Sequence, residues 1–171
     1  EMDESLFMKL APPVTVVGVT GTRGKTTTTQ LIYEMVKASG RKTHLGGNAK
    51  GVSTLPLLEK VKAGDTVVLE LSSWQLQGFG DARISPHIAV FTNFLPDHLN
   101  YYRGSMAMYW QDKAQIFAHQ KPGDVVVAAP EAARRIRAMR PAIKSRLVIA
   151  RPQDVPRSWK VRLAGAHNRA N

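Results

Sequence analysis

The segment from 14 to 29, VTVVGVTGTRGKTTTT, constrains the fold of this chain more than any other. Its first half is rich in β-branched apolar residues, which is typical of a buried strand, and residues 25–39 have the pattern of a helix. Between them lie Gly18, Gly21 and Gly24, and glycine allows the positive φ angles that turn backbone N–H groups toward a ligand. The segment therefore predicts a strand, a glycine-rich turn and a helix in direct succession.

A turn of this kind is suited to holding an anion. The backbone N–H groups, the positive end of the helix dipole and the Lys25 ammonium would converge on one phosphate, and the Thr26 hydroxyl is placed to bind Mg²⁺. The spacing departs from the common G-x-x-x-x-G-K-[ST] pattern because position 19 is valine, so we interpret Gly18 as the opening residue of the loop. We predict a phosphate-binding loop in which alanine at Lys25 abolishes nucleotide binding.

Length and composition indicate an ordinary globular domain. The 171 residues suffice for one domain with a sizeable core, and 43% of them are hydrophobic while 22% are charged. No apolar run approaches the length of a membrane span and no basic-then-apolar leader opens the chain, so we expect a cytoplasmic location. The absence of cysteine excludes a disulfide framework and any thiolate metal site.

The formal net charge of +11 permits either a nucleic-acid partner or a small anionic substrate. The basic residues are scattered, however, and aromatic residues do not alternate with them as in single-strand binders. The densest cluster has helical spacing, and we interpret it as one solvated helix face. Its members are Arg134, Arg135, Arg137 and Arg140. We therefore expect neither a nucleic-acid nor a membrane partner.

Strands and helices alternate along the rest of the chain. Further strands are predicted over 43–45, 66–71, 88–91, 125–128, 147–150 and 159–163, and helical patterns over 1–10, 55–61, 106–117 and 131–139. We interpret residues 72–76 as a polar turn. This alternation predicts an α/β fold, a three-layer domain of the P-loop type with a mainly parallel sheet flanked by helices.

Three polar residues follow or accompany predicted core elements. Glu70 lies near the end of a buried strand, where parallel sheets bind ligands, so it would either hold Mg²⁺ or pair with a basic residue. His98, beside Asp97, follows another strand and is either a metal or phosphate contact or an ordinary surface or core histidine. Lys113 shares a helix face with core residues, and its ammonium either extends to solvent, which the pattern favours, or reaches into a site.

Five motifs together resemble the Mur ligase family, in the family's order and over almost the whole chain. They are GVTGTRGKTT at 18–27, GGN at 46–48, ELSSWQL at 70–76, TNFLPDHL at 92–99 and GAHNRAN at 165–171. The second and third are most similar to those of the members that add D-glutamate. The resemblance implies an ATP-dependent amide ligase of peptidoglycan synthesis. ATP would phosphorylate the carboxylate of UDP-N-acetylmuramoyl-L-alanine, and D-glutamate would attack the acyl phosphate.

The resemblance also implies roles for individual residues. Lys25, His98 and Lys113 are expected to be catalytic, Lys25 by contacting the β- and γ-phosphates. Of two Mg²⁺ ions, Thr26 and Glu70 would hold one, whereas His98 and a carbamylated Lys113 would hold the other. The expected nucleotide contacts are Gly21, Thr22, Arg23, Gly24, Lys25, Thr26 and Thr27 in the loop, with Asn168 and Asn171 near adenine. The expected contacts to the UDP-sugar are Asn48, Ser72 and Ser73.

The extent of the resemblance leads to an expectation about domains. Residues 1–13 would form the connection from an N-terminal UDP-binding domain, residues 14–171 would form the central ATP-binding domain, and the C-terminal domain would be absent. We expect a monomer that binds ATP and Mg²⁺ weakly and does not ligate alone. Arg23 and Asn100 depart from the family pattern, where asparagine and aspartate are frequent. The alternatives are another Mur-type or folylpolyglutamate-type ligase, or a non-catalytic nucleotide-binding module.

Overall fold

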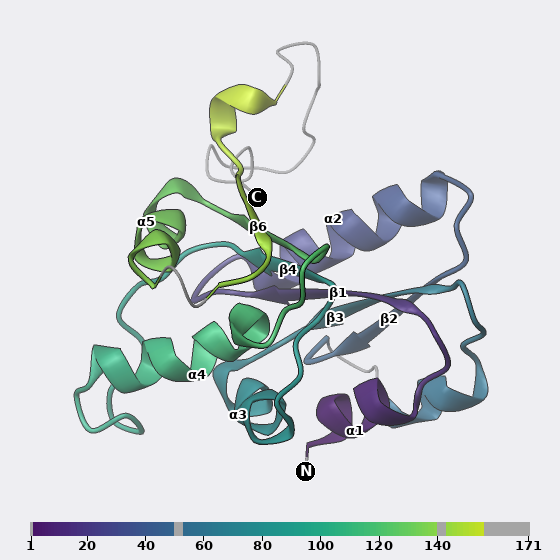
Figure 1. Cartoon of the computed structure of the whole chain (residues 1–171), viewed down its shortest axis with the longest axis horizontal. Helices are drawn as coiled ribbons and strands as arrows, with labels where there is room; N and C mark the ends of the chain where they lie inside the picture. Colours follow the sequence, from purple (N-terminus) through teal and green to yellow (C-terminus); the bar gives the residue numbers. More distant parts are fainter. Residues whose placement is uncertain (1, 50–52, 140–142, 156–171) are drawn as a thin grey trace.

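Within the described part of the chain, six parallel strands form one sheet in the order β2–β3–β1–β4–β5–β6 (Figure 1). The computed structural model describes residues 2–49, 53–139 and 143–155. The strands are β1 (Thr15–Thr20), β2 (Thr43–Gly47), β3 (Thr66–Glu70), β4 (Ile88–Phe91), β5 (Val125–Ala128) and β6 (Arg146–Ile149). Because β1 lies between β3 and β4, the carboxyl ends of these three strands meet at one edge of the sheet.

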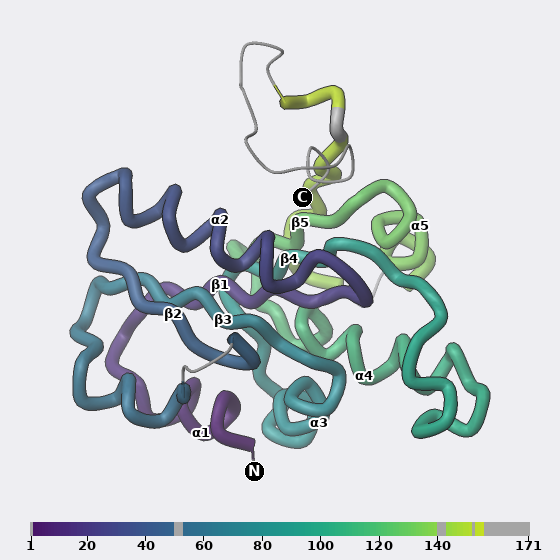
Figure 2. The backbone as a smooth tube through the Cα atoms, turned by 180° about the vertical axis from the view of Figure 1, so that it is seen from behind, coloured from purple at the N-terminus to yellow at the C-terminus, as the bar shows by residue number. Residues whose placement is uncertain are grey.

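Helices cover both faces of the sheet. They are α1 (Asp3–Leu10), α2 (Lys25–Ala38), α3 (Ser73–Ala82), α4 (Met106–Ala118) and α5 (Pro130–Ala138), with short 3₁₀ helices η1 (Leu55–Glu59) and η2 (Pro152–Asp154). Figure 1 shows α2 above the sheet and α1, α3 and α4 below it, and Figure 2 shows the same layers from behind. The predicted three-layer α/β fold with a parallel sheet is confirmed. Among the described helices, none is long and apolar enough to cross a bilayer.

The core is divided by the sheet. The larger part includes Phe7 of α1, Phe91 of β4 and Phe117 of α4, all at most 1% exposed. On the α2 face, Val17 and Val19 of β1 pack with residues of β3 and α2. Because β1 is buried on both faces, it needs the continuous β-branched run that its sequence carries.

The interpretation of residues 72–76 as a polar turn is wrong, because α3 begins at Ser73. The Ser72 hydroxyl accepts a hydrogen bond from the Gln75 backbone at 3.3 Å, and the Ser72 N–H donates to the Gln75 side chain at 2.8 Å. This capping box satisfies the free N–H groups at the helix start. A Cβ atom at Gly78 would lie 2.8 Å from Met2 Cγ, so this glycine lets α1 approach α3 closely.

The assignment of Gly18 to the loop is also wrong. Gly18 lies inside β1, opposite Leu69 of β3 and Ala89 of β4. A Cβ atom there would lie 2.5 Å from Pro86 Cγ, so the glycine provides space for packing rather than for a turn. The other predicted boundaries shift by a few residues, and the helical pattern at 55–61 is the 3₁₀ helix η1. The strand predicted at 159–163 lies outside the described residues.

Candidate nucleotide-binding site

The glycine-rich turn lies between β1 and α2, at the carboxyl edge of the sheet. Gly21 has a φ angle of 146° and Gly24 one of 78°, in the region that favours glycine. A Cβ atom at Gly21 would lie only 1.9 Å from Thr92 Oγ1, so no other residue fits there. Gly24 precedes the first residue of α2, and no side chain in the described ranges caps this helix. The helix N-terminus is therefore available to an anion, as predicted.

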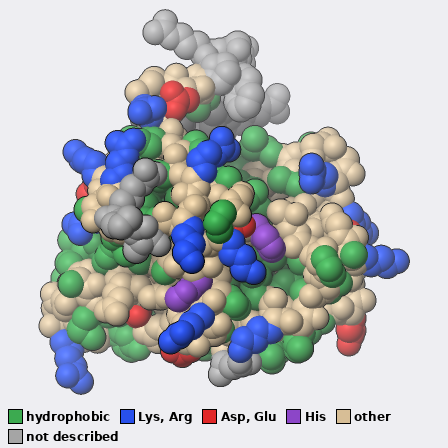
Figure 3. Space-filling view, in the orientation of Figure 1, with side chains coloured by type: hydrophobic (Ala, Val, Ile, Leu, Met, Phe, Trp, Pro, Cys, Tyr) green, Lys and Arg blue, Asp and Glu red, His purple; other side chains and the backbone are tan. Residues whose placement is uncertain are grey.

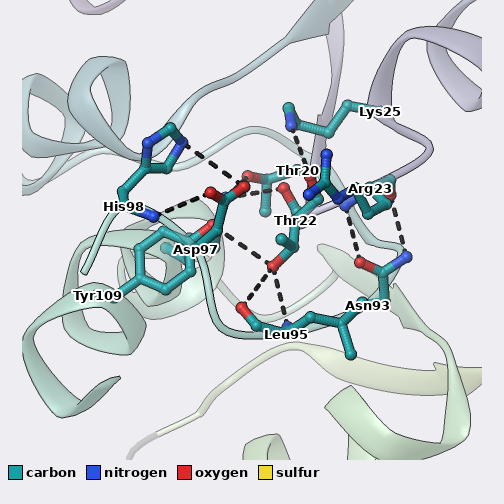
Figure 4. A network of polar contacts seen from close by, with 11 residues as sticks. Thr20, Thr22, Arg23, Lys25, Asn93, Leu95, Asp97, His98 and Tyr109 are labelled. Carbon is teal, nitrogen blue, oxygen red and sulfur yellow. Dashed lines mark hydrogen bonds and ion pairs between the residues drawn. The ribbon is translucent and has the colours of Figure 1, made fainter. Parts of the chain in front are cut away.

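The segment after β4 holds this turn through several hydrogen bonds (Figure 4). The Arg23 N–H donates to Asn93 Oδ1 at 2.8 Å, and Asn93 Nδ2 donates to the Arg23 carbonyl at 3.0 Å. The Thr22 N–H donates to the Asn93 carbonyl at 3.0 Å, and the Thr22 hydroxyl accepts from the Leu95 N–H at 3.0 Å. Sequence reasoning gave Asn93 no role. Its position directly after a strand adjacent to β1 was the signal that could have identified it.

Lys25 is the first residue of α2, and its ammonium lies over the turn. Lys25 Nζ donates to the Thr22 carbonyl at 3.2 Å. Partial burial lowers the pKa of Lys25, and the negative charges of Glu70 and Asp97 act in the opposite direction. Arg23, Thr26 and Thr27 lie beside it, with Arg23 and Thr26 exposed. The predicted loop residues are thus brought together around one ammonium group.

Glu70 is the last residue of β3 and pairs in register with Val19 of β1. It is only 2% exposed. Oε1 accepts a hydrogen bond from Asn48 Nδ2 at 3.3 Å, whereas buried Oε2 has no hydrogen-bond partner among the described residues. No ion pair joins Glu70 to another residue in the described ranges, so the alternative of a salt bridge finds no support there. A buried carboxylate oxygen without a partner is costly unless a cation binds it.

These groups fit a Mg²⁺ ion that also binds phosphate. The part of the chain that the structure describes contains no group of three or more histidine, cysteine or acidic residues that could hold a metal. Mg²⁺ commonly uses one or two carboxylates and takes its other ligands from waters and substrate phosphates. The unpartnered Glu70 oxygen and the exposed Thr26 hydroxyl meet that requirement.

Lys113 extends from α4 to the underside of the turn. It is 1% exposed, and its Nζ donates to the Gly21 carbonyl at 2.9 Å and to Thr20 Oγ1 at 3.3 Å. Its ammonium also lies 5.0 Å from the centre of the Tyr109 ring. Burial, aided by the nearby Lys25 charge, lowers the pKa of Lys113 to about 7. The interpretation that its side chain extends to solvent is therefore wrong, because the α4 face that carries it packs against the end of β1.

His98 lies on the loop between β4 and α4, and Figure 4 shows it beside Asp97 at the edge of the site. Its φ angle is 51°, its N–H donates to Asp97 Oδ1 at 2.9 Å, and its Nε2 lies 3.9 Å from Asp97 Oδ2. Its ring packs against Trp74 at 4.9 Å between centroids. The side chain is 40% exposed, so it can contact a bound ligand.

The predicted UDP-sugar contacts follow the carboxyl ends of β2 and β3. Asn48 follows β2 and is exposed, and its N–H donates to the Glu70 carbonyl at 2.8 Å. Ser72 is half-buried at the start of α3, whereas Ser73 is 2% exposed and hydrogen-bonded to Tyr102. The other two predicted contacts, Asn168 and Asn171, lie outside the described residues.

Together, the parallel sheet, the turn and the buried Glu70 define a nucleotide-binding domain of the P-loop type. A family model described as the Mur ligase middle domain matches residues 19–160. This chain therefore belongs to the Mur ligase family, through the middle domain of that family.

Curated relatives agree with this assignment. Over 156 residues the chain is 42% identical to a UDP-N-acetylmuramoylalanine--D-glutamate ligase of Roseiflexus sp. (strain RS-1), covering 91% of this chain and 31% of that protein. It is 45% identical over 127 residues to the ligase of the same name from Clostridium acetobutylicum, covering 74% of this chain and 26% of that protein. The chain thus spans about a third or less of the length of these relatives.

Solved structures share the fold. One is the MurF ligase from Thermotoga maritima in complex with ADP, with a TM-score of 0.65 and 24% identity, covering 85% of this chain and 34% of that chain. Another is a UDP-N-acetylmuramoyl-L-alanyl-D-glutamate--2,6-diaminopimelate ligase, with a TM-score of 0.60 and 25% identity, covering 81% of this chain and 32% of that chain.

Proposed function

We propose that this chain is the ATP-binding domain of a ligase that joins D-glutamate to UDP-N-acetylmuramoyl-L-alanine. The observation that carries the proposal is the glycine-rich turn with Lys25 on one side and a buried, unpartnered Glu70 oxygen on the other. An anion site beside a cation site is what a Mg²⁺-bound triphosphate requires. The choice of D-glutamate rests on the relatives that are 42% and 45% identical.

In the proposed reaction, a carboxylate oxygen of the acceptor attacks the γ-phosphorus of ATP, and the bond to the β–γ bridging oxygen breaks to release ADP. The D-glutamate nitrogen then attacks the acyl carbon, loses a proton and expels phosphate. Lys25 and the backbone N–H groups of the turn would stabilise the charge on the transferring phosphoryl group. Thr26 and Glu70 would hold one Mg²⁺, and His98 and a carbamylated Lys113 would hold a second; the ions would supply charge neutralisation when bound.

Lys113 fits a role as a carbamylated lysine. A neutral amine is needed to attack the carbon of CO₂ and form a carbamate with loss of a proton, and the lowered pKa of about 7 makes that form available near neutrality. The carbamate would turn a cation into an anion able to bind the second Mg²⁺. We expect native mass spectrometry in bicarbonate to show the added CO₂, whereas full activity of an unmodified lysine would contradict the role.

The intact enzyme would be a larger protein, since the chain spans 31% of the Roseiflexus relative. In our proposal, residues 1–13 connect to an N-terminal UDP-binding domain, residues 14–171 bind ATP with Asn168 and Asn171 near adenine, and a C-terminal domain completes the site. Asn48, Ser72 and Ser73 would face the UDP-sugar. We further propose a monomeric, cytoplasmic enzyme and expect no ligation by the isolated domain.

Nucleotide binding by this chain tests the proposal directly. We expect Lys25→Ala to lower ATP affinity by about a hundredfold or more, because a partly buried, charge-assisted contact to the phosphates is lost. The matched control is Lys37→Ala, which removes an exposed lysine from the last turn of the same helix. Isothermal titration calorimetry measures the affinity of both variants for Mg-ATP. Unchanged affinity in Lys25→Ala would contradict the assignment.

Substrate choice requires the full-length ligase. We expect phosphate release from ATP to depend on both UDP-N-acetylmuramoyl-L-alanine and D-glutamate. Release with another amino acid, or with a folate acceptor, would favour a different ligase of this fold. A non-catalytic module would bind ATP without any acceptor-dependent release. Nucleic-acid binding has no support on the face shown in Figure 3, where Lys and Arg side chains are spread over several elements rather than gathered in one patch.

A further inference from the structure

Glu4 of α1 is a buried carboxylate outside residues 19–160, which the family model matches. It is 6% exposed and forms no ion pair with any residue in the described ranges. Its Oε1 instead accepts two hydrogen bonds, the first from Thr54 Oγ1 at 3.2 Å and the second from Gln75 Nε2 at 2.8 Å. Burying a carboxylate is costly, and the two hydrogen bonds to Oε1 offset part of that cost.

The first of these bonds leads to the turn after β2. The Thr54 hydroxyl, which donates its hydrogen to Glu4, accepts the Gly47 N–H at 2.8 Å. Gly47 has a φ angle of 81°, and the next residue, Asn48, donates to both the backbone and the side chain of Glu70. Glu4 therefore connects through one hydroxyl to the turn that presents Asn48.

The second bond leads to the start of α3. A carboxylate only accepts hydrogen bonds, so the Gln75 amide must direct its NH₂ group toward Glu4 and its oxygen the other way. That oxygen accepts the Ser72 N–H at 2.8 Å. By the same reasoning, Thr54 must donate to Glu4 and is left to accept from Gly47. The carboxylate thus fixes one end of each hydrogen-bond chain, and a backbone N–H, which can only donate, fixes the other end.

We infer that Glu4 is a positioning residue for the part of the site proposed to contact the UDP-sugar. It holds the Gly47–Asn48 turn and the Ser72 end of α3 relative to each other. Thr54 and Gln75 transmit this effect, and Glu4 itself touches no substrate. The substrate half of this inference rests on the function proposed above, whereas the coupling of the two elements does not.

Hydrogen exchange on this chain tests the coupling without any substrate. In Glu4→Ala, we expect the Gly47 and Ser72 amides to exchange about tenfold faster, because the side chains that accept them, Thr54 and Gln75, lose the contact that helps to hold them in place. The Thr22 amide, bonded to the Asn93 carbonyl, should keep its rate. Glu4→Gln keeps an acceptor oxygen and should stay within about threefold of the wild type.

A control separates this effect from general destabilisation. Val126→Ala opens the core at β5, away from both elements, and should accelerate exchange without selecting the Gly47 and Ser72 amides. Equal acceleration of all amides in Glu4→Ala would reduce Glu4 to a structural residue and overturn the inference. Unchanged Gly47 and Ser72 amides would also overturn it.

Kinetics of the full-length ligase test the functional half. We expect Glu4→Ala to raise KM for the UDP-sugar substrate about tenfold while KM for ATP changes less than about threefold, with Glu4→Gln restoring both. A selective exchange effect without this KM change contradicts the positioning role. If the wild-type ligase does not use D-glutamate, the proposed function fails, but the exchange result still stands.

Discussion

The carboxyl edge of the sheet has two flanks that differ in how their polar groups are satisfied. On the β4 flank, residues 92–95 bond the N–H and hydroxyl of Thr22 and the N–H and carbonyl of Arg23. On the β2 flank, Glu70 keeps one buried oxygen without a partner among the described residues. Thr22 and Arg23 are thus held in place while the N–H groups at the start of α2 stay available, whereas the β2 flank keeps a carboxylate oxygen with no described partner.

This difference indicates separate roles for the two flanks, one in binding phosphate and the other in binding the cation that accompanies it. A turn held by the backbone keeps its N–H groups oriented, so little conformational freedom is lost when a phosphate binds. An unpartnered carboxylate has the opposite property, because it is stabilised only when a cation comes with the ligand. We expect substitutions on the β4 flank to act on phosphate binding itself and those on the β2 flank to act on its Mg²⁺ dependence.

The largest expected effect comes from Gly21→Ala. The added methyl group would lie 1.9 Å from Thr92 Oγ1 at a φ angle that L-residues avoid, so the turn cannot keep its shape. We expect ATP affinity, measured by titration calorimetry, to fall by about a hundredfold or more. Gly64→Ala is the matched control, because Gly64 also has a positive φ but no atom within 4 Å of its added Cβ. Equal losses in both variants would show that backbone strain alone was responsible.

Glu70→Gln tests the Mg²⁺ dependence expected of the β2 flank. Removing the charge should weaken Mg-ATP binding about tenfold, since a metal ligand is lost. Affinity for ATP in EDTA should rise instead, because Glu70 no longer repels the phosphates. Exposed Glu59 provides the control Glu59→Gln. Titrations with Mg²⁺ and with EDTA give the two ATP affinities. An equal loss of affinity under both conditions would argue against a role of Glu70 in metal binding.

The burial of Lys113 beneath the turn predicts a pH effect on stability. Its pKa is about 7 in the folded chain against 10.5 for an ordinary lysine, so between these values the unfolded state binds one more proton. Stability should therefore rise with pH from about 7 to 10, by up to about 1.4 kcal/mol per pH unit from this group. Urea unfolding of Lys113→Met should show a shallower rise, unlike exposed Lys62→Met. Equal slopes would exclude the buried ammonium as the cause.

The smallest expected effect concerns Arg135, which lies 4.8 Å from the Phe94 ring centre and 5.8 Å from that of Trp110. This cation–π contact covers a residue in the segment that holds the turn. Arg135→Ala should lower the free energy of unfolding by about 0.5–1 kcal/mol. Arg134→Ala, one position earlier on the same exposed helix surface, should change it less. Urea denaturation compares the two, and equal effects would indicate loss of helix charge rather than of the contact.

Local patterns in the sequence were sufficient for most of the architecture. The β-branched run of β1, Gly24 and Lys25 all have their expected places because strand, turn and helix start depend on near neighbours. The helix α3 was missed because Gly78 and Gly80 weaken its helix propensity and the polar start resembled a turn. The capping pair Ser72 and Gln75 was the local signal that could have revealed it.

Other features depended on residues far apart in the chain. Whether the Lys113 ammonium is buried or extends to solvent depended on how α4 packs, since its partners Thr20 and Gly21 are more than 90 residues away in the sequence. Gly18 was misassigned for the same reason, because only the approach of Pro86 explains it. No local sequence pattern marked Glu4 as a positioning residue. Its hydrogen-bond partners Thr54 and Gln75 lie 50 and 71 positions further along the chain.

By itself, the sequence determined the glycine-rich turn, the alternation of strands and helices and the Mur ligase resemblance, since each depends on neighbouring residues whose backbone preferences are local. The tertiary structure alone decided which charged side chains are buried, which carboxylate oxygens accept hydrogen bonds and which residues pack against the glycine-rich turn. The physical reason is that burial and hydrogen bonding depend on the atoms that surround a group, and the fold draws those atoms from distant parts of the chain.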